Sequence, residues 1–212
     1  MSGSSKPRRR RHTAEQAERA ILAAARTFLA EHPFRELTAE TVMARTGLSR
    51  QAFYAYFQDR YDLATRLLEG IGALLFAVDR AWLEGTEETR DEARASLSEA
   101  LKRGSEAFLY YGPVLKAISD AASQDTRVEE VYRFGLIENF VNSVAKRIER
   151  DVQTGMSPAD LDPDETAKAL VLLTERYLLD AFGRPQSKPS EAQIATVAST
   201  LERAWINTLY GS

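Results

Sequence analysis

The chain has 212 residues, 44% of them apolar and 28% charged, which is typical of a soluble globular protein of one or two domains. It has no cysteine, so disulfides, a thiolate nucleophile and a cysteine-ligated zinc site are excluded. The net charge of -3 is unevenly divided: residues 1–60 hold 11 basic and 6 acidic side chains, and the remainder holds 17 and 25. Only the N-terminal part should therefore be attracted to phosphate.

The chain begins with a short basic segment. Residues 6–11 read KPRRRR and follow a small polar leader, MSGSS. This pattern favours an arm that follows the DNA backbone or enters the minor groove, so the candidate contacts include Arg8, Arg9, Arg10 and Arg11. The alternative is a solvated tail, or in part a cloning remnant.

No segment has the pattern of a membrane span or a secretory signal. The longest uncharged apolar stretch, residues 70–78, is far shorter than the roughly 20 residues that cross a bilayer. Arg26 and Glu31 interrupt the apolar residues that follow the basic segment. We therefore expect a cytoplasmic protein without a membrane partner.

The first helix is predicted to start at Thr13, where Gln16 completes a capping box. His32 precedes Pro33 and resists the α conformation, so the helix should end there. Its apolar stripe should pack on the segment that follows and comprises Ala17, Ile21, Ala24, Ala25, Phe28 and Leu29.

Residues 37–57, LTAETVMARTGLSRQAFYAYF, predict two short helices around a tight turn. Thr38 can cap the first helix, Gly47 breaks it, and Ser49 can cap the second, predicted over residues 50–56. A helix-turn-helix of this kind lays its second helix in the DNA major groove.

The second of these helices divides into an inward and an outward face. Phe53 and Phe57, four residues apart, should face the core. Arg50, Gln51 and Tyr54 should point outward, where the first two can reach base edges from the N-terminal end of the helix.

The rest of the chain also reads as helix, since no run shows the sustained alternation of a strand. A connector helix is expected over residues 60–83. Further helices are expected over 92–111 and, after a hard break at Gly112 and Pro113, up to about residue 123. The last three are expected over 127–152, 164–182 and 190–209, which gives an all-α fold of about nine helices.

The capped helix, the Gly47 corner, the Ser49 cap and the aromatic ending FYAYF resemble the TetR family of bacterial transcriptional repressors. The resemblance extends over about the first third of the chain. It implies a basic arm (residues 1–12), a DNA-binding domain (13–60) and a ligand-binding and dimerisation domain (61–212). Arg60 replaces the usual lysine and keeps its charge, so the implied phosphate contacts include Tyr56 and Arg60. The predicted DNA-binding residues therefore also include Thr38, Ser49, Tyr56 and Arg60.

The C-terminal stretches LLTERYLLDAFG and AWINTLYGS resemble the mycobacterial ethionamide-resistance repressor branch of that family. In that branch an Asn-Glu pair stands at the positions of Thr174 and Glu175. Its pocket is richer in tryptophan than this chain, which has two, so its ligand is not carried over.

An apolar pocket with a few polar groups is expected between the C-terminal helices. Each aromatic residue taken alone is more often plain core. Asn139 and Glu175 carry more weight, because a polar side chain inside an apolar bundle needs a partner. The candidate lining residues are Phe108, Tyr111, Phe134, Asn139, Phe140, Thr174, Glu175, Leu178 and Trp205.

The helix over 164–182 is apolar nearly all round and should be buried from two directions. We expect one face inside the subunit and a two-fold, four-helix dimer interface with the last helix; a monomer that buries both helices is the alternative. The stripe expected at that interface is Ile194, Val197, Ala198, Leu201, Trp205 and Leu209.

The two histidines, His12 and His32, do not form a base or ligand pair, and no phosphate loop or metal-spaced set occurs, so we expect no enzyme, cofactor or metal. The sequence predicts a homodimeric repressor that binds a palindromic double-stranded operator and is released by a small lipophilic effector. The alternative is an architectural DNA-binding protein without an effector. A solvent-excluded cavity of several hundred Å³ would favour the first.

Overall fold

The computed structural model describes residues 14–184 and 189–211, and all regular elements in these ranges are helical. None of their helices is long and apolar enough to cross a membrane. The elements are α1 (Ala14–Leu29), η1 (Phe34–Glu36), α2 (Ala39–Met43), α3 (Arg50–Phe53), α4 (Arg60–Leu83), α5 (Arg90–Ala122), α6 (Thr126–Glu129), η2 (Glu130–Ile137), α7 (Glu138–Gln153), α8 (Pro163–Phe182) and α9 (Glu191–Leu209).

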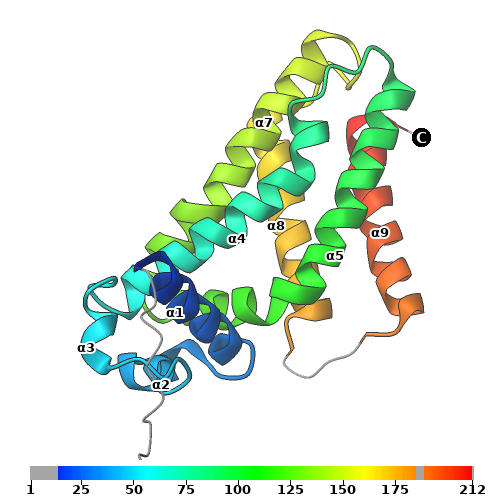
Figure 1. Ribbon diagram of the computed structural model, residues 1–212. Coiled ribbons are helices and arrows are strands. Elements are labelled where there is room, and N and C mark those ends of the chain that lie inside the picture. The colour runs from blue at the N-terminus through cyan, green and yellow to red at the C-terminus, as the bar shows by residue number, and fades with distance from the viewer. Residues whose placement is uncertain (1–13, 185–188, 212) are drawn as a thin grey trace, which may run out of the picture.

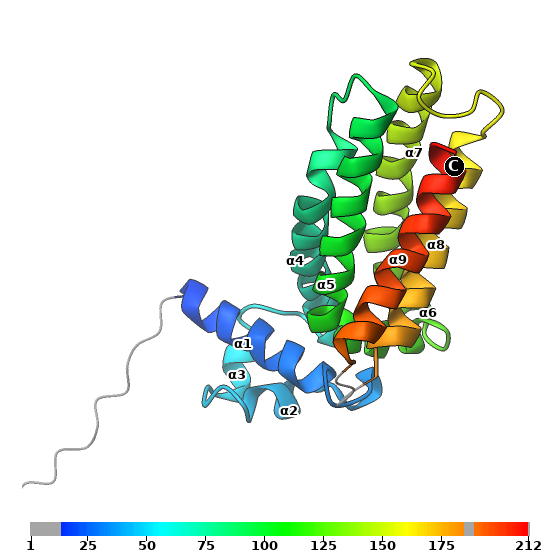
Figure 2. The ribbon, with the colours of Figure 1, turned by 90° about the vertical axis from the view of Figure 1, so that its right-hand side faces the viewer.

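The first three helices gather at one end of a larger bundle formed by α4, α5, α7, α8 and α9 (Figures 1 and 2). The predicted cap residue Thr13 and the basic arm lie outside the described residues. The apolar stripe of α1 is buried as expected, and it consists of Ala17, Ile21, Ala24, Ala25, Phe28 and Leu29.

Helix α4 has the predicted bounds and runs from the small N-terminal group of helices into the bundle (Figure 1). Asp59 caps it by accepting from the backbone N–H groups of Tyr61 and Asp62.

The expected break at Gly112 and Pro113 is wrong, since α5 is a single helix of 33 residues that contains Pro113. The proline removes one backbone hydrogen bond, but burial of Val114, Leu115 and Ile118 outweighs that loss. Gly112 has a different role. A Cβ there would lie 3.0 Å from the carbonyl oxygen of Phe182, so the glycine permits the close approach of α8.

The helix expected over 127–152 has nearly the right ends but not the expected regularity. It is continuous through α6, η2 and α7, and the middle piece, η2, is a π-helix of 8 residues. The wider turn of a π-helix shifts the phase of the side chains. Phe134, predicted to line a pocket, is consequently 53% exposed, whereas Tyr132 and Leu136 are buried.

The C-terminal helices pack differently from the expectation. Val197, Leu201, Trp205 and Leu209 of the α9 stripe are buried within the subunit, where α9 contacts α5 and α8, so this stripe does not form a free interface. On α8, Leu172 and Leu173 remain 44% and 46% exposed. The sequence pattern located the apolar stripe on α9 but could not say which neighbour would cover it.

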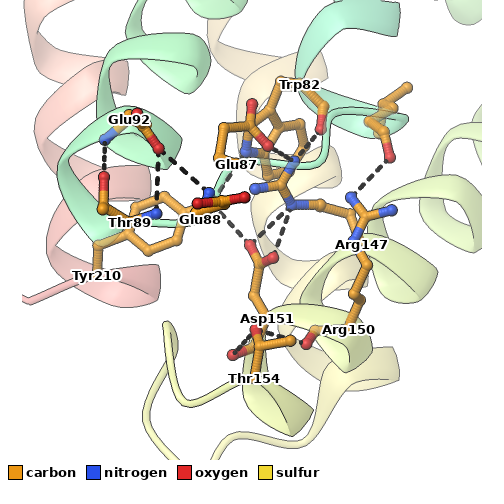
Figure 3. Close-up of polar contacts among 11 residues, drawn as sticks. Trp82, Glu87, Glu88, Thr89, Glu92, Arg147, Arg150, Asp151, Thr154 and Tyr210 are labelled. Atoms are coloured by element: carbon orange, nitrogen blue, oxygen red, sulfur yellow. Dashed lines mark hydrogen bonds and ion pairs between the residues drawn. The ribbon is translucent and has the colours of Figure 1, made fainter.

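A buried polar cluster joins the far end of α4, the 84–89 loop, α7 and the C-terminus (Figure 3). The Arg147 Nε donates to both carboxylate oxygens of Asp151, at 2.9 and 2.8 Å, and Nη1 donates to Glu87 Oε2 at 2.9 Å and to the Trp82 carbonyl. Tyr210 donates to Asp151 at 2.8 Å and accepts from Trp82 Nε1 at 2.9 Å. This network fixes the end of the bundle away from the first three helices.

Candidate nucleic-acid interface and internal cavity

The turn between α2 and α3 is built by local bonds. Thr38 accepts from the backbone of Thr41, and Thr41 accepts in return from the backbone of Thr38, which forms the expected cap. Gly47 has φ +68°, a conformation that glycine adopts without strain. Thr46 Oγ1 donates to the Met43 carbonyl and accepts from the Leu48 backbone at 3.1 Å.

Helix α3 is shorter than predicted, because regular α geometry ends at Phe53 and a tight turn continues to Tyr56. Phe53 and Phe57 are buried with ring centroids 5.5 Å apart, as expected. Ser49 occupies the N-cap position in extended conformation, but its side chain makes no cap hydrogen bond. The expected Ser49 side-chain cap is therefore wrong.

The outward side of the turn is exposed and carries the predicted polar residues. Thr38, Ser49, Arg50, Gln51 and Tyr54 are exposed, and Tyr56 is half-buried against the core. Arg50 Nη1 lies 2.7 Å from Glu40 Oε1, and its pKa is raised, first by a hydrogen bond with Tyr54 and then by the Glu40 charge. Glu40, which the sequence analysis did not single out, therefore aligns Arg50 across the two helices.

Arg60 is half-buried at the start of α4. Its guanidinium donates to the Arg35 carbonyl at 3.3 Å and to the Tyr61 hydroxyl at 3.0 Å, and lies over the rings of Phe34 and Tyr61. These contacts hold the charge beside the turn.

The first turn of α4 is tied to α6. Arg127 Nη2 donates to Asp59 Oδ2 at 2.7 Å, and the Tyr61 hydroxyl donates to Asp125 Oδ2 at 2.6 Å. Arg127 also lies 3.9 Å from the centroid of the Tyr61 ring. The hydrogen bond from Tyr61 is the largest cause that lowers the pKa of Asp125. We call these four residues, Asp59, Tyr61, Asp125 and Arg127, the α4–α6 joint.

A partly open cavity lies among α4, α5, η2, α7, α8 and α9, with a free volume of about 100 Å³. This volume is smaller than the several hundred Å³ that would have favoured an effector-binding protein over the architectural alternative. Most of its wall is apolar, and the larger side chains on it are Trp82, Phe108, Tyr132, Leu136, Phe140 and Trp205.

Two polar pairs cross the cavity wall. The Trp205 indole donates to Thr174 Oγ1 at 2.8 Å, and the Tyr132 hydroxyl donates to Glu175 Oε1 at 2.7 Å. Burial, and then the Glu175 charge, raise the pKa of Tyr132 well above its usual value, so the phenol remains a donor. The second pair connects η2 to α8.

Asp79 also lines the cavity, from α4. Burial raises its pKa to about 7, and the more distant charge of Arg103 opposes that rise only in part. No described residue forms a hydrogen bond or an ion pair with it that would stabilise the carboxylate.

The structure brings six of the nine predicted pocket residues together on this wall: Phe108, Phe140, Thr174, Glu175, Leu178 and Trp205. Tyr111 is half-buried beside Tyr110 and does not reach the cavity. Phe134 and Asn139 are exposed, and Asn139 donates to the Gly135 carbonyl, so the interpretation of Asn139 as an interior polar group is wrong.

Sequence reasoning missed Asp79, Trp82 and Tyr132 on the wall. A usable signal existed for Asp79, since it is a lone acid within the otherwise apolar face of α4 and stands three residues before Trp82. Nothing in the sequence indicated the π-helix that turns Tyr132 inward.

Two family models match the chain. Residues 21–67 match "Bacterial regulatory proteins, tetR family", and residues 97–211, more than half of the chain, match "Transcriptional regulator EthR, C-terminal domain".

Among similar proteins are two that are named HTH-type transcriptional regulator EthR. That of Mycolicibacterium smegmatis is 27% identical over 206 residues, covering 95% of this chain and 90% of the relative. That of Mycobacterium tuberculosis is 27% identical over 214 residues, covering 99% and 96%. A solved TetR-family regulator from Rhodococcus sp. shares the fold, with a TM-score of 0.73 at 21% identity, covering 91% of this chain and 98% of that one. The chain therefore belongs to the TetR family of bacterial transcriptional regulators, with a C-terminal domain of the EthR type, and is not an enzyme.

Proposed function

We propose that this regulator is a cytoplasmic repressor that binds a palindromic operator as a homodimer and is released by a small lipophilic ligand. In this proposal residues 1–12 are a basic arm, residues 13–60 bind DNA, and residues 61–212 bind the ligand and form the dimer. Arg50, Gln51 and Tyr54 read bases, while Thr38, Ser49, Tyr56, Arg60 and the arm hold the phosphates.

One observation carries the ligand-responsive part of the proposal, namely the continuous helical run from α6 through η2. Its N-terminal end forms the α4–α6 joint with the first turn of α4. Its C-terminal part supplies Tyr132, Leu136 and Ile137 to the cavity wall. Whatever displaces η2 therefore acts on the helix that follows the turn.

The small volume of the cavity supports this coupling. A ligand larger than a few heavy atoms has to separate η2 from α4, which pack so closely that a Cβ at Gly72 would lie 3.0 Å from Leu136 Cδ1. Such a ligand binds the expanded arrangement better and shifts the population towards it by that difference in affinity.

For the dimer we propose the outward faces of α8 and α9. Leu172 and Leu173 are the large apolar side chains exposed there. A two-fold axis at this face would pair the same surface of both subunits. Binding to two half-sites one helical turn apart requires the two recognition helices to lie about 34 Å apart.

The test is operator affinity with and without a ligand found by thermal-shift screening, for wild type and Thr174→Trp. The larger side chain should occupy the cavity and abolish the response, while the dimer persists in analytical ultracentrifugation. Thr86→Trp, the same change on the exposed loop before α5, is the control that should keep the response. Ligands that raise the melting temperature but leave wild-type operator affinity unchanged would reject the switch and leave the architectural alternative.

A further inference from the structure

The charged residues on the cavity wall are of one sign. Asp79 on α4 and Glu175 on α8 line the cavity, and no lysine, arginine or histidine of the described chain lies among its lining residues. The remainder is almost entirely apolar and aromatic. An ionised carboxylate in such surroundings is costly, so it either takes up a proton or gains from a cationic partner.

Glu175 already has a neutral partner in the Tyr132 hydroxyl, at 2.7 Å. Asp79 has none among the described residues. The candidate on the facing helix α5 is Arg103, whose Nε lies 3.5 Å from Glu99 Oε1 and has no hydrogen-bond partner in the part of the chain that the structure describes. Asp79 is thus an acid that forms no ion pair with a described residue, and the charge of Arg103 favours its carboxylate only in part.

The surroundings of Asp79 have room for that counter-charge. Gly104 of α5 faces the carboxylate, since a Cβ there would lie 3.8 Å from Asp79 Oδ1. Trp82, three residues after Asp79, and Phe108, four residues after Gly104, are also on the cavity wall. A cation with apolar substituents would be stabilised at such a site in two ways. Its charge would pair with the acid, and its apolar groups would pack against the aromatic rings.

We propose that the effector is a lipophilic cation, an amine or a quaternary ammonium, whose nitrogen lies against Asp79 and whose apolar body lies between α5, η2 and α8. This inference rests on the proposed function, because it names the chemical class of that function's ligand. A neutral ligand would bury Asp79 without a partner, and an anionic one would be repelled by both acids.

Two probes of nearly the same shape separate charge from bulk: benzyltrimethylammonium and its neutral carbon analogue neopentylbenzene. Both tryptophans of the chain, Trp82 and Trp205, line the cavity, so intrinsic fluorescence reports its occupancy. Measurement at pH 8 keeps most of the Asp79 carboxylate ionised, because burial raises its pKa only to about 7.

In the wild type the cation should bind at least about tenfold more tightly than the neutral probe. Asp79→Asn should bring the two affinities to within about threefold, and Glu175→Gln should reduce the preference less. Glu69→Gln removes the same charge from the exposed side of α4 and should keep the full preference. Circular dichroism checks that each variant folds. If Asp79→Asn does not fold, the inference is tested by the ratio of the two probe affinities in the wild type and in Glu175→Gln.

Equal affinities in the wild type, tighter binding of the neutral probe, or an absence of response to both would overturn the inference. A preference for the cation that survives in Asp79→Asn would overturn it as well. A measurement of operator affinity distinguishes a failure of the cation inference from a failure of the proposed function. Release by a neutral ligand with no cation preference rejects the cation alone, whereas Asp79-dependent cation binding that leaves operator affinity unchanged rejects the repressor switch.

Discussion

The turn between α2 and α3 and the cavity of the bundle handle polar groups in opposite ways. On the turn, Arg50, Gln51 and Tyr54 are exposed, and the bonds that shape the turn join residues a few positions apart. At the cavity, the polar groups are half-buried or buried and are paired between helices, except that Asp79 forms no hydrogen bond or ion pair with a described residue. Changes on the turn should therefore affect DNA binding with little effect on folding, whereas changes around the cavity should affect stability and the ligand response.

The largest expected effect lies in the buried cluster that adjoins the cavity through Trp82. Arg147→Met keeps the bulk of the side chain but leaves Asp151 and Glu87 without their cation. The free energy of unfolding should fall by about 3–5 kcal/mol, as is usual when one partner of a buried ion pair is removed. Urea denaturation measures it.

The double variant Arg147→Met, Asp151→Leu provides the matched control. It removes both charges of the principal pair, so it should recover a large part of the stability that the single variant loses. A single variant as stable as the wild type would show that the cluster does not hold the end of the bundle.

Asp79 should make the free energy of unfolding depend on pH, an effect that we do not expect from the exposed residues of the turn. Its pKa rises from an ordinary 3.8 to about 7 on folding, so the folded state keeps a proton that the unfolded chain has released. The contribution of Asp79 to the free energy of unfolding should therefore be greatest below pH 4, fall as the pH rises towards 7, and level off above it. At about 1.4 kcal/mol per unit, the fall is on the order of 4 kcal/mol.

Asp79→Asn removes this contribution. The difference in unfolding free energy between the variant and the wild type, measured at pH 5 and pH 8, should favour the variant more at pH 8. A difference that does not change with pH would mean that Asp79 titrates as an exposed acid.

Substitution of Arg50 should affect DNA binding strongly and stability little. Arg50→Ala should weaken binding to the cognate operator by about 1–3 kcal/mol and binding to random DNA much less, because a guanidinium that bonds a base edge is specific. The melting temperature should change little, since the side chain is exposed. Fluorescence anisotropy on both DNAs measures this, and equal losses would assign Arg50 to the backbone alone.

The contrast between the two regions also explains what could be predicted from sequence. Thr38, Gly47, Phe53 and Phe57 act through neighbours within a turn or two, so their spacing indicated their roles. The cavity is assembled from several helices, and a phase shift in η2 or a continuous helix through Pro113 changes which residues meet there. These features explain why Phe134 and Asn139 were wrongly predicted to line the cavity and why Asp79 was missed. Thr174 and Glu175 were predicted correctly to line it, and their positions match an Asn-Glu pair in the similar repressor branch.

The measurement that tests the account most directly is the operator dissociation constant with and without a saturating cavity ligand, in the wild type and in Arg127→Gln. The variant breaks the α4–α6 joint at its ion pair with Asp59, which is remote from the cavity wall. The ligand should weaken operator binding about 5- to 150-fold in the wild type, the range of an ordinary allosteric coupling. In Arg127→Gln the ligand should still bind, as tryptophan fluorescence reports, while its effect on operator binding becomes clearly smaller. An undiminished effect in the variant, or no effect in the wild type, would contradict the coupling of the cavity to the turn through α6 and η2.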